Sequence, residues 1–417
     1  MTSYLFILRQ VLSNRNMVAL IVSDVVFMFG GNLWWAFQSL YILELGASTE
    51  ILGMLFMFQT VTTLAFQFPA GVAADRLGRK KLILWGAIIR CIPPLIYLVA
   101  SHWTFFIPGM LVNALSSIDM PAWNALVIES LPLQSRGAGY SLYRTLTAIS
   151  GVFMMPLGGI LLDSMGVVPG TRLCLMVNEV MMIIYTGILW RFITETKREG
   201  EAEETETHEK KEALTTIQKL RTLPKGIWIL MVVGGLSSFA IRLSSSFTIV
   251  YATQVIGLSK TEWGIIGTFV SLISIAITTP AGFLGDRIGR KPCILASQIL
   301  SLVSTFLFIN LYNFSGILFS RALEGVATGF GGLVMGEMGG SNWQALIADF
   351  VPSESRGSIM GLIGTIIGAL GAPSPWIGGY FYENLSPILP FQLNIVLRAV
   401  AVLIFLLLLK EPKEKAK

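Results

Sequence analysis

The sequence predicts an all-α integral membrane protein with twelve transmembrane helices, arranged as two pseudo-symmetric bundles of six helices each. Three observations support this prediction: the composition is apolar, twelve stretches are long enough to cross a bilayer, and the halves of the chain repeat each other. Of the 417 residues, 53% are hydrophobic and only 13% are charged. A soluble domain carries about 25% charged residues, so a water-soluble chain of this length is disfavoured.

Crossing the apolar core of a bilayer takes about 20 helical residues, and a helix satisfies its own backbone polar groups there. The predicted spans are 17–43, 50–73, 82–101, 103–127, 138–162, 170–192, 226–250, 262–284, 293–311, 314–337, 357–381 and 386–409. One long polar stretch joins the sixth span to the seventh. We therefore divide the chain into an N-terminal bundle (1–193), a cytoplasmic linker (194–225) and a C-terminal bundle (226–417).

The positively charged residues predict the orientation. Most of the 30 Lys and Arg residues fall in loops on one side of the predicted membrane, whereas the opposite loops hold only Arg172 and Lys260. Because loops rich in Lys and Arg stay in the cytoplasm, we expect a multi-pass protein of the cytoplasmic (cell inner) membrane with both termini cytoplasmic. The same loops account for the net charge of +5 without a nucleic-acid partner.

The two halves of the chain match each other in order. PAGVAADRLGRK at 69–80 aligns with PAGFLGDRIGRK at 280–291, an offset of 211 residues. WNALVIESLPLQSRG at 123–137 aligns with WQALIADFVPSESRG at 343–357, and Gly158-Gly159 aligns with Gly378-Gly379, both at an offset of 220. The change in offset predicts about nine extra residues around 325–341, in the tenth helix. Parallel six-helix repeats of this kind suggest a solute site between the repeats and alternating access to it.

A loop rich in glycine and arginine follows the second and the eighth predicted helices. Its residues are Gly71, Asp75, Arg76, Gly78 and Arg79 in the first half, and Gly282, Asp286, Arg287, Gly289 and Arg290 in the second. Gly78 and Gly289 permit a tight turn, Gly71 and Gly282 permit close approach of a neighbouring helix, and the arginines can pair with carboxylates. Two copies at equivalent loops of a twelve-helix chain resemble the signature loop of the major facilitator superfamily, over essentially the whole chain.

The resemblance implies a transporter that holds no cofactor or metal and works as a monomer. It also implies that Asp75 faces the start of helix 11 near Arg356 and, with Glu129 at the end of helix 4, holds the cytoplasmic side closed. Asp349 is the repeat equivalent of Glu129. The alternative is a tight turn with no gating role. Many proton-coupled drug exporters of the family carry Gly-Pro before the Gly-Gly of helix 5, where this chain has Met154-Met155, a departure that weakens the exporter interpretation.

Charged residues inside a span are functional candidates, because each costs about 2.5–3.5 kcal/mol on the insertion scale. The polar residues on helices that line the solute path in the family are Asp24, Asn32, Gln38, Asp119, Arg144 and Arg242. We expect Asp24 or Asp119 to carry a coupling proton. The alternative is a permanent ion pair, such as Asp119 with Arg144. Arg90, on an outer helix, is expected to form a structural pair. Pro156 and Pro375 are expected to kink helices 5 and 11.

The sequence leaves the solute open. Aromatic and Met-rich helices favour an amphipathic drug or metabolite and efflux by antiport, whereas Arg144 and Arg242 together favour an organic anion, and a symporter or facilitator of a sugar is a further alternative. The chain has no Gly-x-Ser-x-Gly, no His-rich cluster and no nucleotide-binding loop, which disfavours an enzyme. A membrane sensor on the same scaffold would carry an added signalling domain, for which the linker and tail are too short.

Overall fold

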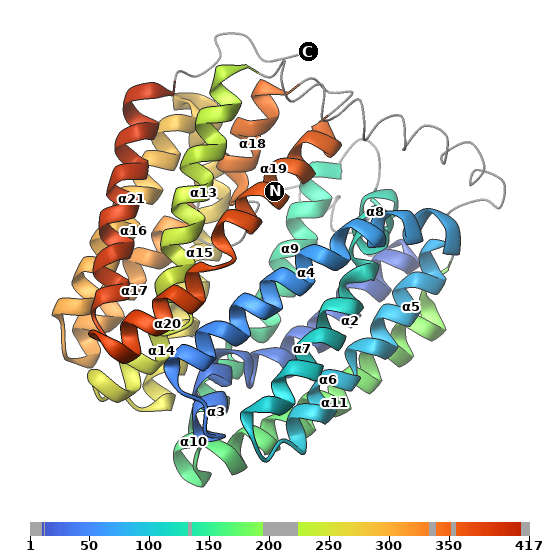
Figure 1. The fold of residues 1–417 in the computed structure, drawn as a ribbon. Coiled ribbons are helices and arrows are strands. Elements are labelled where there is room, and N and C mark those ends of the chain that lie inside the picture. Colours follow the sequence, from blue (N-terminus) through green and yellow to red (C-terminus); the bar gives the residue numbers. More distant parts are fainter. Residues whose placement is uncertain are drawn as a thin grey trace. The chain divides into compact units, whose positions relative to one another are not determined.

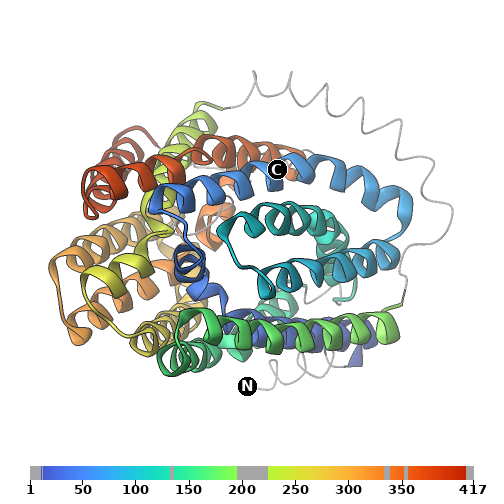
Figure 2. The same ribbon diagram turned by 60° about the horizontal axis from the view of Figure 1, so that its bottom comes forward.

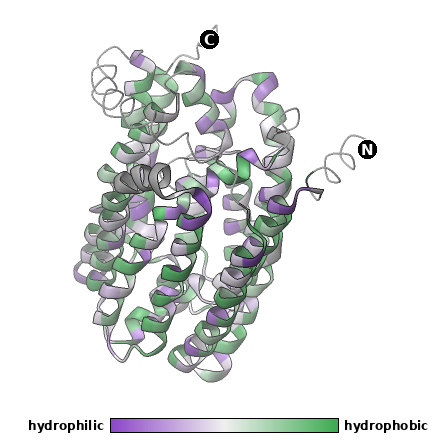
Figure 3. Ribbon diagram, turned by 90° about the vertical axis from the view of Figure 1, so that its right-hand side faces the viewer, coloured by the Kyte–Doolittle hydropathy of each residue, from purple (hydrophilic) through white to green (hydrophobic). Residues whose placement is uncertain are grey.

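The structure is a computed structural model, and it describes residue 11 and residues 13–131, 136–194, 224–332, 339–351 and 356–409. Within these ranges residues 67–77 and a few others are described by their backbone alone. All regular elements of the described residues are helical (Figure 1). Hydrophobic residues predominate along the helices (Figure 3), as a chain that crosses lipid requires.

The chain divides into two compact units, and the division does not follow the sequence halves strictly. The first unit comprises Met1–Ala47, Thr62–Glu206 and Ser259–Gly264, and the second comprises Ser48–Val61, Thr207–Leu258 and Ile265–Lys417. Two long helices therefore change unit along their length. Helix α4 (Thr49–Leu77) changes after Val61, and α15 (Lys260–Ile288) changes after Gly264.

The first unit is built around α2. Its other elements, besides most of α4, are η1 (Trp35–Phe37), α3 (Gln38–Glu44), α5 (Arg79–Arg90), α6 (Ile92–Leu98), η2 (Trp103–Phe105), α7 (Phe106–Ser116), η3 (Ser117–Asp119), α8 (Met120–Glu129), α9 (Arg136–Val152), α10 (Met154–Met165) and α11 (Val167–Phe192). Helix α2 (Arg15–Asn32) packs against α11 and α9 (Figure 2). Its buried core includes Met17, Leu20 and Leu189. Close packing stabilises such a core, since lipid is as apolar as these side chains.

The second unit repeats this arrangement around α13 (Lys225–Ser245). Its other elements are α14 (Thr248–Val250), the π-helical η5 (Tyr251–Val255), most of α15, α16 (Arg290–Asn310), α17 (Phe314–Gly329), α18 (Ser341–Phe350), α19 (Arg356–Gly371), α20 (Ser374–Asn384) and α21 (Leu389–Leu408). Helix α13 packs against α21 and α19, the counterparts of α11 and α9 in the first repeat. The core here includes Leu230, Trp343 and Phe405.

The tenth predicted span differs from the structure. The described residues hold 11 helices long and apolar enough to cross a membrane, and the predicted 314–337 is wrong at its end, because α17 stops at Gly329 and α18 begins at Ser341. Gly331 and Gly339 adopt φ values of 67° and 63°, which glycine tolerates and a continuous helix does not. The extra residues of the second repeat thus fall between α17 and α18, inside the predicted interval 325–341.

Helices 5 and 11 are each broken near a proline, as predicted. Helix α9 ends at Val152 and α10 begins at Met154, with Pro156 in its first turn. Helix α19 ends at Gly371 and α20 begins at Ser374, with Pro375 in its first turn. Proline lacks the backbone N–H that would continue the helix and clashes with the preceding turn, so each helix is interrupted there.

Candidate functional site

A chain of polar side chains joins α2, α8 and α9 in the first unit. The hydroxyl of Tyr143, on α9, donates a hydrogen bond to a carboxylate oxygen of Asp24 on α2. The same hydroxyl accepts a hydrogen bond from Nε1 of Trp123, on α8, at 3.1 Å. Asp24 is half-buried, and its hydrogen-bond partner is neutral. A carboxyl group held in this way can gain or lose a proton without breaking an ion pair, a property of carboxylates in proton pathways.

Asp119 has a different partner from the predicted one. Arg90, at the end of α5, donates to both carboxylate oxygens of Asp119 at 2.8 and 2.9 Å and to the Tyr185 hydroxyl at 3.1 Å. The predicted pairing of Asp119 with Arg144 is therefore wrong. Gly86 permits the pairing of Asp119 with Arg90. A Cβ at position 86 would lie 2.4 Å from Asp119 Oδ2, so only glycine leaves room on α5 for the carboxylate to reach Arg90. Both bonds come from the single nitrogen Nη2, and hydrogen bonds between charged partners are stronger than those between neutral ones.

Several aromatic rings pack against one another and against the partners of these two carboxylates. The ring of Phe27 lies 5.3 Å from that of Trp35 and 5.5 Å from that of Tyr185, measured between centroids. Trp123 stacks on Tyr185 at 6.3 Å, and the Arg90 guanidinium lies 5.6 Å from the Phe27 centroid, a cation–π contact. Flat apolar surfaces beside a few polar groups are the usual lining of sites for amphipathic small molecules.

The other candidates of the first repeat make fewer contacts with this cluster. Asn32 donates to the Met28 carbonyl of its own helix at 3.0 Å. It also lies against α9, where a Cβ at Gly151 would sit 2.1 Å from Asn32 Nδ2. Gln38 is half-buried at the start of α3, and Arg144 is exposed. The positive charge of Arg144 still acts on Asp24.

Arg242 is the predicted site residue of the second unit. Its Nη1 donates to the hydroxyl of Thr60, on α4, at 3.1 Å, and its aliphatic chain lies against α19, where a Cβ at Gly371 would be 3.1 Å from Arg242 Cδ. Thr60 is thus a neutral hydrogen-bond partner of this guanidinium, as Tyr143 is of Asp24 in the first unit. Arg242 is half-buried.

A second polar network joins α16, α17 and α21. Arg398, only 2% exposed, donates to the Ser301 hydroxyl at 2.6 Å and to Gln298 Oε1 at 2.9 Å. The Ser301 hydroxyl in turn donates to the Glu324 carboxylate at 2.7 Å. Arg321 lies over the Phe308 ring, 5.7 Å from its centroid. The Ser301 hydroxyl thus links a buried cation to a half-buried anion, and this network connects three helices of the second unit.

The signature loop is partly described in the first repeat. Predictions that concern the side chains at Gly71, Asp75 and Arg76 fall outside the described residues, because 67–77 are described as helical backbone alone. Gly78 has a φ of 79° immediately before α5, a conformation that glycine adopts readily. Arg79, the first residue of α5, forms an ion pair with Glu129 at the end of α8.

The second repeat contains the equivalent contacts. Gly289 has a φ of 99° before α16. Arg290 Nε lies 3.1 Å from Asp349 Oδ2, and Arg290 Nη2 lies 2.9 Å from Asp286 Oδ1. Arg287 is exposed. The close approach predicted at Gly282 is not found among the described residues, since a Cβ at that position would meet none of their atoms within 4 Å.

Sequence reasoning missed Tyr143, Trp123 and Tyr185 as members of the first-unit cluster. Tyr143 is directly followed by the predicted Arg144, and Trp123 begins one of the repeated segments. A search for polar aromatic residues at membrane depth on helices 4 to 6 could have singled them out. The pattern could not show that their side chains meet Asp24 and Arg90, because this depends on how each helix is rotated about its axis.

Comparison with known proteins establishes the family. A model of the Major Facilitator Superfamily matches residues 20–259 and again residues 230–417. The chain belongs to this superfamily. The resemblance drawn from the two signature loops is thereby confirmed, and with it the prediction of a transporter fold with two six-helix bundles.

Solved structures of this superfamily share the fold over the whole chain. A mutant form of the nucleoside transporter NupG has a TM-score of 0.73 at 14% identity, covering 95% of this chain and 100% of that one. A D-xylose–proton symporter has a TM-score of 0.73 at 15% identity, covering 98% and 100%. At such identities the likeness concerns the fold alone.

Curated relatives match a shorter part of the sequence. The quinolone resistance protein NorA of Staphylococcus aureus is 31% identical over 159 residues, which are 38% of this chain and 39% of NorA. The multi-drug resistance efflux pump PmrA of Streptococcus pneumoniae is 34% identical over 115 residues, 27% of each protein. The chain thus spans less than half the length of the curated relatives it matches.

Proposed function

We propose that this protein is a secondary active transporter that moves a small solute across the cytoplasmic membrane by alternating access, with Asp24 as the proton-coupling group. The contrast between two carboxylates supports the choice of Asp24. The negative charge of Asp119 is balanced by the Arg90 guanidinium, which donates two hydrogen bonds to it. Removing either partner would leave the other charge unpaired. Asp24 is held by the neutral Tyr143, so a proton can bind there without that penalty.

The solute we propose is an amphipathic organic compound, and the direction is export. Support comes from the rings of Phe27, Trp35 and Trp123 around the polar cluster, and from the similarity to NorA and PmrA, whose names describe drug resistance and efflux. A defined organic anion is the alternative, favoured by the half-buried positive charge of Arg242.

The orientation belongs to the same proposal. The helix ends beside Gly78 and Gly289 are basic, at Arg79–Lys81 and Arg287–Lys291, whereas the connections at 45–48 and 385–388 carry no Lys or Arg. Basic loops remain in the cytoplasm, so we place both signature loops and both termini there.

The test is transport by the purified protein reconstituted in liposomes. The panel is a fluorescent lipophilic cation, an aromatic carboxylate and a sugar, each measured with and without an imposed pH gradient. We expect movement of the lipophilic compound that is driven by the gradient and abolished by an uncoupler. Asp24→Asn should remove the effect of the gradient while solute exchange at equal pH continues, because the amide keeps the shape and the Tyr143 contact but cannot titrate.

Glu44→Gln is the matched control, since Glu44 is an exposed carboxylate at the end of α3. It should retain the gradient dependence of the parent protein. Unchanged gradient dependence in Asp24→Asn would show that Asp24 is not the coupling group. Gradient-driven movement of the carboxylate alone would favour the organic-anion alternative.

A further inference from the structure

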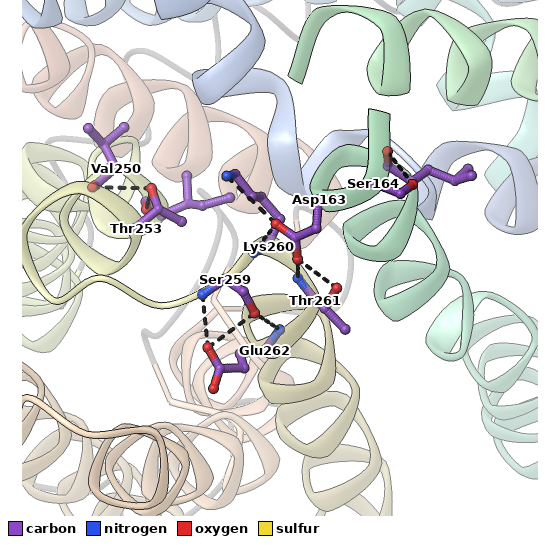
Figure 4. A network of polar contacts seen from close by, with 10 residues as sticks. Asp163, Ser164, Val250, Thr253, Ser259, Lys260, Thr261 and Glu262 are labelled. Carbon is purple, nitrogen blue, oxygen red and sulfur yellow. Dashed lines mark hydrogen bonds and ion pairs between the residues drawn. The ribbon is translucent and has the colours of Figure 1, made fainter. Parts of the chain in front are cut away.

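The starts of α4 and α15 are each capped by a carboxylate from the other sequence repeat. Asp163, on α10, accepts hydrogen bonds from the backbone nitrogens of Lys260 and Thr261 at 3.1 and 2.8 Å (Figure 4). Asp163 also accepts a bond from the Thr261 hydroxyl at 2.7 Å. Glu383, on α20, accepts from the backbone nitrogen of Thr49 at 2.8 Å and from the Thr49 hydroxyl. We call these two contacts the inter-repeat caps.

The inter-repeat caps are equivalent under the internal repeat. The helix starts, Thr49 and Lys260, are 211 residues apart, and the carboxylates, Asp163 and Glu383, are 220 residues apart. These are the two offsets that relate the halves of the chain. Each carboxylate stands four residues after the Gly-Gly pair of its helix. The same chemistry therefore occurs twice, at matched places.

Each helix start also has a local cap of its own. The Ser48 hydroxyl accepts from the backbone nitrogen of Ile51 at 3.2 Å, and the Ser259 hydroxyl accepts from that of Glu262 at 3.1 Å. The Glu262 carboxylate in turn accepts a bond from the Ser259 nitrogen at 2.8 Å (Figure 4), which completes a capping box. The first N–H groups of a helix have no partner within the helix. Here each serine hydroxyl accepts a bond from one of these N–H groups, and the inter-repeat caps accept bonds from the N–H groups of the first helical residues.

Close backbone contacts bring the capped ends together. A Cβ at Gly159 would lie 2.3 Å from the Lys260 carbonyl oxygen, and a Cβ at Gly379 would lie 2.5 Å from the Thr49 carbonyl oxygen. Such contacts leave no space for any side chain larger than hydrogen. The second glycine of each Gly-Gly pair therefore permits the helix start to reach the carboxylate one turn further along.

We propose that Asp163 and Glu383 are a matched pair of releasable caps that hold the side of the transporter opposite the basic loops closed. Both caps break when the protein opens to that side. The proposal rests on the alternating access proposed above, which requires helix ends of the two repeats to separate. Helices α4 and α15 begin on the side opposite the signature loops, which follow their far ends, so the caps act at the face that must open.

Exposure makes these caps reversible. The Asp163 side chain is 27% exposed, and Glu383 is exposed, so water can solvate the carboxylates and the freed N–H groups after release. The Asp119 side chain, in contrast, is 2% exposed, and its separation from Arg90 would strand a charge. Carboxylates at helix starts also meet the positive end of the helix dipole. The contact is therefore strong enough to bias an equilibrium and weak enough to break in each cycle.

The test measures the distance between the ends of α10 and α20, the helices that carry the two capping carboxylates. Spin labels are placed at two exposed positions, Met165→Cys at the last residue of α10 and Leu385→Cys just beyond α20, after Cys91, Cys174 and Cys293 are changed to Ala. We expect the reconstituted parent to populate mainly a short distance in the absence of solute. Asp163→Ala and Glu383→Ala should each raise the ratio of long to short distances about fivefold, the effect of losing one helix cap. The double variant should raise it about 25-fold if the effects add.

Ser259→Ala and Glu262→Gln provide the matched control, because they remove the local cap of α15 and leave Asp163 in place. They should lower the melting temperature without changing the distance distribution. An unchanged distribution in the double variant would overturn the proposal, as would an equal shift in the local-cap variants. If an alanine variant fails to fold, Asp163→Asn and Glu383→Gln retain one acceptor oxygen and should give smaller shifts in the same direction.

This measurement uses neither a solute nor a pH gradient. A negative result would therefore leave the proposed role of Asp24 standing, and an Asp24→Asn variant that kept its gradient dependence would leave the caps standing.

Discussion

At the scale of single residues, two aspartates of the first repeat have different partners although both lie in helices that could cross a membrane. Asp119 is 1% exposed and is held by Arg90, which also bonds to Tyr185. Asp24 is half-buried and bonds to Tyr143. A buried carboxylate with a cation keeps its charge, whereas one with a neutral partner can exchange its proton. Charge alone made both residues candidates, and their partners separate the two.

The Arg90–Asp119 pair leads to a prediction about stability. Asp119→Asn should destabilise the folded protein by about 3–5 kcal/mol, because it leaves the half-buried Arg90 guanidinium without its counter-charge. The measurement is the midpoint of thermal unfolding in detergent. Asp24→Asn, which removes a carboxylate hydrogen-bonded to the neutral Tyr143, should lower the midpoint much less.

A double variant separates the ion pair from simple side-chain packing. Arg90→Gln combined with Asp119→Asn should be less destabilised than the sum of the two single variants, since neither charge is then stranded. Strict additivity would mean that the two residues contribute independently and that the pair is not the unit of stability.

At the scale of elements, the Gly-Gly pairs of α10 and α20 divide their contacts in the same way. The second glycine of each pair meets the start of a helix from the other repeat, as described above. The first packs within its own repeat: a Cβ at Gly158 would lie 2.1 Å from the Leu33 carbonyl oxygen, and one at Gly378 would lie 2.0 Å from that of Leu243. The two glycines of each pair thus let α10 or α20 pack closely against two other helices at once, one from each repeat.

A prediction for these helices follows from the lack of space. Gly158→Ala and Gly378→Ala should each destabilise the protein by about 1–3 kcal/mol, the usual effect of forcing a methyl group into a packed interior. Thermal unfolding in detergent measures it. Gly187→Ala on α11 is the matched control, because a Cβ there would meet nothing within 4 Å, and it should cause no loss. Equal effects at 158 and 187 would contradict the packing account.

At the scale of the whole molecule, the repeat is kept at the helix ends and lost in the polar interior. The signature loops pair Arg79 with Glu129 and Arg290 with Asp349 in the same manner, and the inter-repeat caps are likewise matched. In the interior, the position equivalent to Arg90 is Ser301 in the second repeat, at the offset of 211. The helix-end contacts of the two repeats do the same work in alternating access, so they can use the same residue types. The interior must bind a solute and a proton, and these need different side chains in the two repeats.

The parallel repeats give a prediction of topology. Cysteines at the exposed Lys81 and Arg287 should react with a membrane-impermeant thiol reagent from one side of the membrane, and cysteines at the exposed Ser101 and Leu385 from the other. Labelling of intact cells and of inverted vesicles distinguishes the sides. Reaction of Lys81→Cys and Arg287→Cys from opposite sides would contradict two repeats of the same orientation.

Much of the fold was predictable, because the bilayer acts on each helix separately. Length and hydropathy mark a span, and Lys and Arg in the loops indicate its direction, without knowledge of any neighbour. The tenth helix was the exception, since α17 ends at Gly329, two residues before the positive-φ Gly331, within a stretch that its apolar residues predict to be one span. Of the candidate site, the residue types were predictable and their pairing was not: Asp119 contacts Arg90 and not Arg144.

The amino-acid sequence by itself determined that this protein crosses the membrane as a duplicated six-helix unit and belongs to a superfamily with two signature loops. Only the tertiary structure decided which carboxylate meets a cation, which meets a phenol, and which cap a helix from the other repeat. The physical reason is that span and orientation depend on residue type along one dimension. Contacts between helices depend on their rotation and on close packing of small residues, and many rotations are compatible with the same hydropathy pattern.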